Sequence, residues 1–188
     1  MSLSIFVLAA LSALVGVSAQ VHVTTAAGSK PEVSKRLRGT DGFVPMPPTI
    51  ECDDMFKSDG SFTDNGILCI YLVSDATTLV TNLTLGDVTM PANNSDFVVA
   101  PPATIGAEGG WFSFHSLIEN SNIQPWTGEV QYTALDSAGD TYVMSAVFTF
   151  TEAMIDIGFN FPQRHGIDVM PEVYYSPNWV TGFHIYDK

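Results

Sequence analysis

The most regular stretch of the chain, residues 127–151, alternates apolar and polar side chains. A period of two residues is typical of a β-strand with one buried face. The alternation is interrupted at 136–140 by Asp-Ser-Ala-Gly-Asp, which favours a turn. The pattern therefore predicts a β-hairpin with a five-residue loop. The side chains expected in its core are Val130, Tyr132, Ala134, Tyr142, Met144, Ala146, Phe148 and Phe150.

The apolar positions change parity after Phe150, with no loop-like stretch in between. From there the apolar set is Ala153, Ile155, Ile157, Phe159 and Phe161. Such a change predicts a β-bulge, or a strand that passes from one sheet to another, near Thr151 and Glu152.

Shorter or less regular strand patterns cover much of the remaining chain. They lie at 67–73, 79–85, 97–100, 111–118, 169–175 and 179–186. The first is apolar at both parities, as in a central strand that is covered on both faces. No window beyond residue 50 has the pattern of a capped amphipathic helix. We therefore predict an all-β fold, an antiparallel β-sandwich that is immunoglobulin-like or jelly-roll-like, with a closed β-barrel as the second choice.

The first 19 residues form a nearly continuous run of apolar and small side chains. Val17-Ser18-Ala19 places small residues where a signal peptidase reads them, so we predict a signal peptide that is cut after Ala19. This makes the protein secreted and extracellular. No second apolar run is long enough to span a bilayer, so we expect no membrane span.

Residues 20–48 have little apolar periodicity and predict a flexible leader, followed by a single β-sandwich domain over 49–188. Lys35-Arg36 is either a dibasic processing site, which would make the leader a pro-segment cut near 36, or a solvated basic patch. Lys35-Arg36-Leu37-Arg38 also resembles the Arg-x-Leu-Arg motif of secreted oomycete effectors. Lys35 replaces the first arginine, the follow-up motif is missing, and the domains of that family are typically helical. A host-directed effector stays among the options.

The chain is strongly acidic, with 20 Asp and Glu against seven Lys and Arg in 188 residues, a net charge of −13. Four of the seven basic residues lie between 30 and 38, so the chain from Gly39 onward carries 19 acidic and three basic residues. Such a domain repels phosphate backbones, which excludes nucleic acid as a partner. Anionic membrane surfaces are disfavoured for the same reason.

The only two cysteines, Cys52 and Cys69, predict one disulfide in a secreted protein. It would close a loop of 18 residues and stabilise the fold by about 3 kcal/mol on the chain-entropy model. Two free thiols are the alternative. The sequons at Asn82 and Asn93 predict N-glycosylation. Asn82 has the opposite parity to Leu83 and Leu85, which places its side chain toward solvent.

Motifs for a metal, a cofactor or catalysis are mostly missing. Residues 59–65 loosely resemble a calcium loop, but Asp64 stands where glycine is needed and Ile70 where glutamate is needed, so a turn explains them better. We expect no metal and no cofactor. His115 and His184 fall in predicted strands and would form a shared site only if the fold brought them together. Paired carboxylates drawn from Glu108, Glu119, Glu129 and Glu152 would be needed for a glycosidase.

The tryptophans are the remaining functional candidates, because exposed aromatic rings stack on sugars. Trp126 follows Pro125 in a predicted loop at 120–128, and we expect it to form a contact surface with Trp111, Glu108 and the glycine-rich loop 106–110. The sequence thus predicts a secreted, non-catalytic protein that binds an extracellular protein or glycan. The alternatives are a secreted carbohydrate-active hydrolase and a structural component of a wall or matrix.

Overall fold

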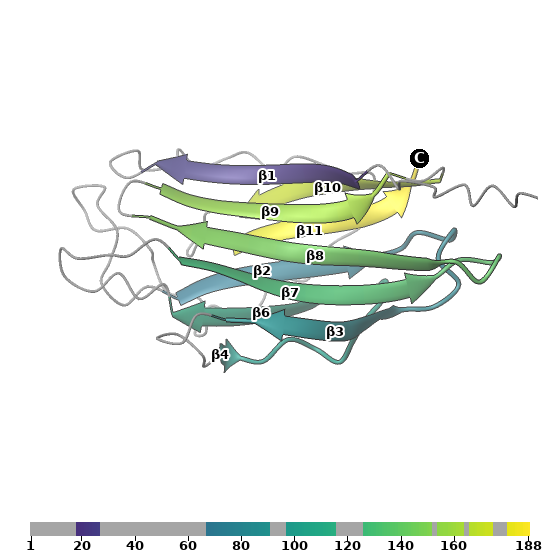
Figure 1. Ribbon diagram of the computed structural model, residues 1–188, viewed down its shortest axis with the longest axis horizontal. Helices are drawn as coiled ribbons and strands as arrows, with labels where there is room; N and C mark the ends of the chain where they lie inside the picture. Colours follow the sequence, from purple (N-terminus) through teal and green to yellow (C-terminus); the bar gives the residue numbers. More distant parts are fainter. Residues whose placement is uncertain are drawn as a thin grey trace, which may run out of the picture.

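The computed structural model describes residues 18–26, 67–90, 97–115, 126–151, 154–163, 166–174 and 180–188, and these residues contain strands and no helix (Figure 1). The strands are β1 (Ser18–Ala26), β2 (Ile67–Ser74), β3 (Leu83–Thr89), β4 (Phe97–Val99), β5 (Thr104–Ile105), β6 (Gly110–His115), β7 (Trp126–Leu135), β8 (Thr141–Phe150), β9 (Met154–Pro162), β10 (Ile167–Tyr174) and β11 (Val180–Asp187).

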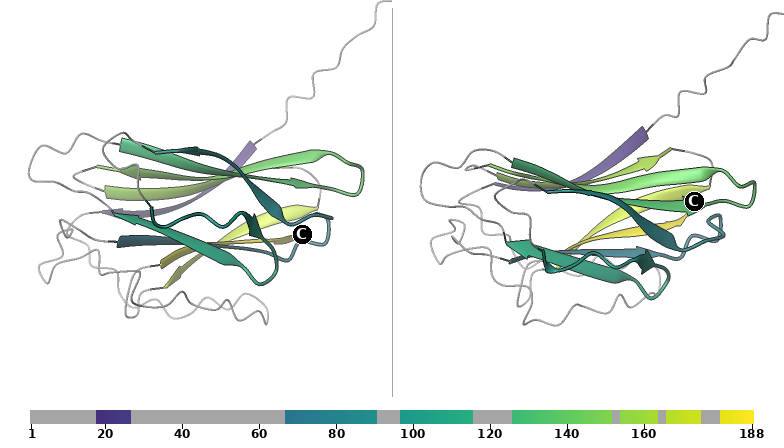
Figure 2. Two further views of the ribbon diagram at one scale, coloured as in Figure 1. Left: turned by 90° about the horizontal axis from the view of Figure 1, so that it is seen from below. Right: turned by 60° about the horizontal axis from the view of Figure 1, so that its bottom comes forward.

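The strands form two sheets that lie one above the other (Figure 2). Sheet 1 has the order β1-β9-β8-β7-β3-β5, and sheet 2 has the order β10-β11-β2-β6-β4. Neighbouring strands are antiparallel except β11 and β2, which run parallel. The β-sandwich prediction is confirmed. The closed barrel is wrong, because the described end strands of the sheets do not pair with one another.

Aromatic side chains from both sheets fill the space between them. Phe114 of β6 stacks on Phe148 of β8 at a centroid distance of 4.4 Å, and Phe159 of β9 stacks on Phe183 of β11 at 5.2 Å. Each pair joins the two layers, and such contacts contribute about 0.5–1.5 kcal/mol beyond the burial itself. All four rings are at most 1% exposed, so one hydrophobic core holds the sheets together.

The predicted hairpin is confirmed. β7 and β8 pair from Trp126↔Phe150 to Leu135↔Thr141, and residues 136–140 form the loop between them. The eight side chains that alternation assigned to its core are all buried. The prediction of a central strand at 67–73 is also confirmed, because β2 lies between β11 and β6 and its residues 68–73 are buried on both faces.

The change of parity after Phe150 has a different cause from the one predicted. β9 returns beside β8 in the same sheet, with Phe150↔Ile155 and Phe148↔Ile157 as partners. Each pair joins an even-numbered residue of β8 to an odd-numbered residue of β9. The core face must therefore change parity between β8 and β9, although both strands lie in the same sheet.

β1 lies at one edge of sheet 1 and pairs with β9 from Ser18↔Pro162 to Ala26↔Met154. Ala19 and Val21 pack against the core. This differs from a flexible leader that begins at residue 20, because 20–26 form a strand. The segment is rich in β-branched residues, which favour strands even at an edge. The rest of the predicted leader lies outside the described residues.

Candidate functional site

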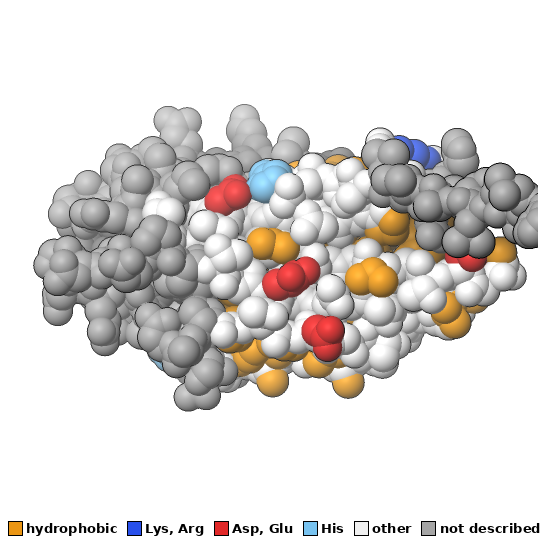
Figure 3. All heavy atoms as spheres, viewed as in Figure 1, with side chains coloured by type: hydrophobic (Ala, Val, Ile, Leu, Met, Phe, Trp, Pro, Cys, Tyr) orange, Lys and Arg blue, Asp and Glu red, His pale blue; other side chains and the backbone are white. Residues whose placement is uncertain are grey.

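The outward side chains of four neighbouring strands in sheet 1 form a broad polar surface, which we call the polar face. They alternate with the buried side chains of β7, β8, β9 and β1. The residues of the polar face are Gln20, His22, Thr127, Glu129, Gln131, Thr133, Val143, Ser145, Val147, Thr149, Asp156, Gly158 and Asn160. Figure 3 looks onto this face, where white groups predominate and a few red and orange side chains lie among them; Ser145 and Gly158 are buried between their neighbours.

Strand pairing arranges the polar face in rows that cross the sheet. One row is Gln131, Ser145, Asn160 and Gln20; the next is Glu129, Val147, Gly158 and His22. Neighbouring side chains in a row are about 4.5–5.5 Å apart, because that is the spacing of paired residues in a sheet. The hydroxyl and amide groups are therefore held at fixed intervals on rigid strands.

Three hydrogen bonds order the polar groups. The hydroxyls of Thr127 and Thr149 are 3.1 Å apart, and the Asn160 amide donates to the Ser145 hydroxyl at 3.3 Å. His22 Nδ1 lies 3.0 Å from Asp156 Oδ2. Hydroxyl and amide side chains both donate and accept hydrogen bonds, so this face can match a ligand that carries hydroxyl groups.

Gly158 makes room for two of these side chains. A Cβ on Gly158 would stand 3.0 Å from Gln20 Nε2 and 3.2 Å from His22 Cε1. The missing side chain therefore lets the Gln20 amide and the His22 ring lie against the sheet. In this position the His22 ring lies 3.0 Å from the Asp156 carboxylate. Gly158 therefore allows the contact that orders the edge of the polar face.

The polar face has no basic side chain other than His22. The described residues contain ten Asp and Glu and a single Lys, Lys188. Two of those carboxylates, Glu129 and Asp156, lie on the polar face, and none of its thirteen residues is Lys or Arg. This face is therefore at least as acidic as the rest of the described chain and is poorly suited to an anionic ligand.

The outer face of sheet 2 is different. Cys69, Tyr71 and Val73 of β2 point away from the main core, yet they are at most 6% exposed and form a second buried cluster. Trp111 of β6 is half-buried against this cluster. The tryptophan therefore serves mainly as a packing residue.

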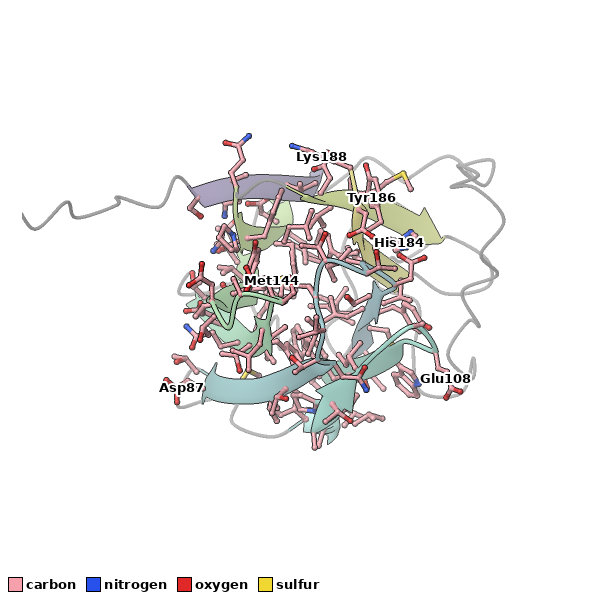
Figure 4. All side chains as sticks on the ribbon, turned by 90° about the vertical axis from the view of Figure 1, so that its right-hand side faces the viewer. Asp87, Glu108, Met144, His184, Tyr186 and Lys188 are labelled. Carbon is pink, nitrogen blue, oxygen red and sulfur yellow. The ribbon has the colours of Figure 1, made fainter. Side chains whose placement is uncertain are left out.

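The three residues expected to form one contact surface do not come together. Trp126 is the first residue of β7 and pairs with Phe150 in sheet 1, so it begins a strand and does not lie inside a loop. Trp111 pairs with Tyr71 in sheet 2. Glu108 lies in the turn before β6, on the side of sheet 2 (Figure 4), where its carbonyl accepts the Tyr71 hydroxyl at 3.0 Å.

His115 and His184 do not share a site. Their strand partners on β2 are Ile67 and Val73, six positions apart, which corresponds to about 20 Å along a strand. His184 instead lies 2.8 Å from the carboxylate of Asp75, with Tyr186 beside its ring (Figure 4).

The described carboxylates do not form a glycosidase pair from the predicted set. Glu108 lies on the side of sheet 2, whereas Glu129 is on the outer face of sheet 1, with the core between them. Asp156 was not in the predicted set; it lies two strands away from Glu129, and its carboxylate is 3.0 Å from His22. Glu119 and Glu152 lie outside the described residues.

Several predicted sites lie partly or wholly outside the described residues. Cys69 is fully buried and is not a free thiol, but Cys52 is not described, so their disulfide stays a prediction. Lys35, Arg36 and Asn93 are also not described, nor is the calcium-like stretch at 59–65. Asn82 is exposed beside β3, and its amide lies against Gly106 and away from the polar face.

The residues of the polar face were missed as a site, although the alternation that identified the core also marks them. Among the described residues, no group of three His, Cys, Asp or Glu could hold a metal ion. None of the described segments forms a helix that is long and apolar enough to cross a membrane. Comparison with protein-family models, with curated proteins and with solved structures finds no match to this chain.

Proposed function

We propose that this protein is secreted and binds an uncharged extracellular polysaccharide through the polar face, without catalysis. The observation that carries the proposal is the composition of that face: seven of its thirteen residues carry a hydroxyl or amide group, two carry a carboxylate, and none is Lys or Arg. Sugar hydroxyls need partners that both donate and accept hydrogen bonds. The rows suit an extended chain, which can lie along them.

Charge narrows the class of ligand. Sulfated and uronic-acid polymers carry one negative charge after another, and a chain with a net charge of −13 repels them. Neutral glucans, mannans and N-acetylglucosamine polymers meet no such barrier. A protein partner is the alternative. The polar face has few large apolar side chains, whereas the core of most protein interfaces is rich in them, so a polysaccharide is favoured.

Binding to insoluble polysaccharides tests the proposal. The purified secreted protein is incubated with cellulose, chitin, β-1,3-glucan, mannan and, as a charged control, pectate. We expect it to sediment with at least one neutral polymer and not with pectate. No retention on any neutral polymer would contradict the proposed function, and release of reducing sugar would contradict the non-catalytic part.

A double variant locates the contact. Gln131→Ala with Asn160→Ala removes two amides from the central row, which should weaken binding about tenfold or more. Glu108→Ala with His115→Ala changes two exposed residues on the side of sheet 2, away from the polar face, and should leave binding unchanged. If both double variants lost binding equally, the contact would not lie on the polar face.

Secretion, the disulfide and glycosylation belong to the same proposal and are tested by intact mass. We expect the secreted chain to begin at Gln20, or near Leu37 if the dibasic site is cut. Reduction should add two hydrogens, for the Cys52–Cys69 disulfide, and an N-glycosidase should remove mass at Asn82, Asn93 or both. An unprocessed chain that begins at Met1 would contradict the proposed compartment.

A further inference from the structure

β1 is an end strand of sheet 1, and β10 of sheet 2 lies near it. β1 pairs with β9 along all nine of its residues, without a register shift, and no described strand pairs with its other side. An edge of this kind carries a row of unpaired N–H and C=O groups, which is a template for another strand.

The other edges of the sandwich each carry a feature that discourages pairing. β10 contains Pro171, which cannot donate to a neighbour, and Asp168, which lies 3.9 Å from Lys188. β4 has three residues and a register shift against β6, and β5 has only two residues. Beyond β5, the pairing of β3 with β7 is irregular between Leu85 and Val88, and this stretch contains Asp87.

β1 has none of these features. Its sequence, Ser-Ala-Gln-Val-His-Val-Thr-Thr-Ala, contains no proline and no Asp, Glu, Lys or Arg. The titratable group it carries is His22, which faces Asp156 of β9. If the signal peptide is cut after Ala19, residues 20–26 still form most of the strand. Cleavage at Lys35-Arg36 would remove β1, so a secreted chain that begins near Leu37 would overturn the pairing proposed for this strand.

We propose that β1 pairs in antiparallel orientation with β1 of a second copy of this chain, joining two copies of sheet 1 edge to edge. The occupant follows from charge. Two acidic molecules repel each other over most of their surfaces, but β1 brings them together along an uncharged strand. Antiparallel pairing of two identical strands also gives a closed two-fold dimer, in which both copies use the same surface.

The pairing has a consequence for binding, and this consequence alone rests on the proposed function. A two-fold axis between antiparallel strands is perpendicular to the sheet, so both polar faces lie on the same side. They form one continuous surface across the two paired β1 strands. A long polysaccharide that crosses both faces would gain affinity from the second contact.

The oligomeric state is measured first, without any ligand. Sedimentation equilibrium on the secreted chain, from about 1 µM to about 1 mM, covers the range expected for a small interface. We expect the average mass to rise from one chain to two across this range. Hydrogen exchange on the same samples should show amides of β1 becoming protected as the concentration rises. A monomeric mass throughout, or a dimer without protection of β1, would overturn the proposal.

A pair of double variants identifies the edge. Gln20→Lys with His22→Lys places positive charge on β1 of both copies, a natural device against edge pairing, and should shift dimerisation to at least tenfold higher concentration. Gln131→Lys with Thr133→Lys adds the same charge to the same face, but on the interior strand β7, and should leave dimerisation unchanged. Loss of the dimer in the second pair alone would mean that the faces stack. Because binding is measured separately, a monomer that still binds polysaccharide would refute the dimer and leave the proposed function standing.

Discussion

Single side chains hold the turns at one end of the sandwich. Asp187, near the end of β11, accepts hydrogen bonds from the backbone N–H of Thr77 at 2.8 Å and of Thr78 at 3.0 Å, and from the Thr77 hydroxyl. These bonds favour the charged carboxylate. The Thr77 hydroxyl is the largest cause, and together they lower the pKa of Asp187 from 3.8 to about 2. The chain's C-terminal strand is thereby fastened to the connection between β2 and β3.

Asp187→Asn should reduce stability in a way that depends on pH. Because the folded-state pKa is depressed, the carboxylate stabilises the fold above about pH 4, and this contribution is lost as the pH falls from about 4 to about 2. The group is exposed, so the effect is small. Urea unfolding of both proteins at pH 7, 4 and 2 should show a gap that closes toward pH 2. A gap that is independent of pH would contradict this role.

Gly109 occupies a place that other residues cannot take. Its φ angle is +74°, and a Cβ there would overlap the Tyr71 hydroxyl, which donates to the Glu108 carbonyl. Gly109→Ala should therefore lower the free energy of unfolding by about 2–3 kcal/mol. Gly139→Ala is the control, because Gly139 has a similar φ of +84° but open space around it, and should cost only about 1 kcal/mol. Equal losses in thermal unfolding would show that steric overlap is unimportant.

At the scale of elements, the β7–β8 hairpin depends on the first residue of its loop. Asp136 Oδ1 accepts hydrogen bonds from the N–H groups of Ala138 and Asp140, both at 2.9 Å. Asp136→Ala should destabilise the protein by about 1 kcal/mol and speed amide exchange at those two positions. Asp136→Asn keeps an oxygen acceptor and should show a smaller change. Exchange rates that are equal in all three proteins would contradict this role.

The sequence predicted the strands whose apolar and polar residues alternate regularly. It did not predict the features that depend on which strands pair with each other. Alternation located β7, β8 and β9, because each has one buried and one exposed face. It did not show that β9 returns beside β8 in the same sheet, since that depends on which residues of β8 and β9 become partners. β5 has only two residues, and β1 begins within the apolar segment that was assigned to a signal peptide, so neither gave a separate pattern.

For the whole molecule, the sandwich could be predicted but the candidate site could not. Trp126, Trp111 and Glu108 were chosen by residue type, and the fold places them on different sheets or sides. The strand order β1-β9-β8-β7 decides which polar side chains share a surface. This order cannot be predicted from the spacing of the residues along the chain. Gln20 and Asn160 become neighbours across 140 positions. The polar face therefore exists only because the fold places these four strands side by side.

Backbone NMR shifts during titration test most directly whether the polar face is the binding surface. The labelled protein is titrated with cellohexaose, chitohexaose and laminarihexaose, each soluble and uncharged. We predict that one of these shifts the amides of Gln131, Ser145, Val147 and Asn160, and leaves those of β2 and β6 unchanged. Shifts confined to sheet 2 or to the 106–110 turn, or no shifts with any of the three, would contradict the role assigned to this face.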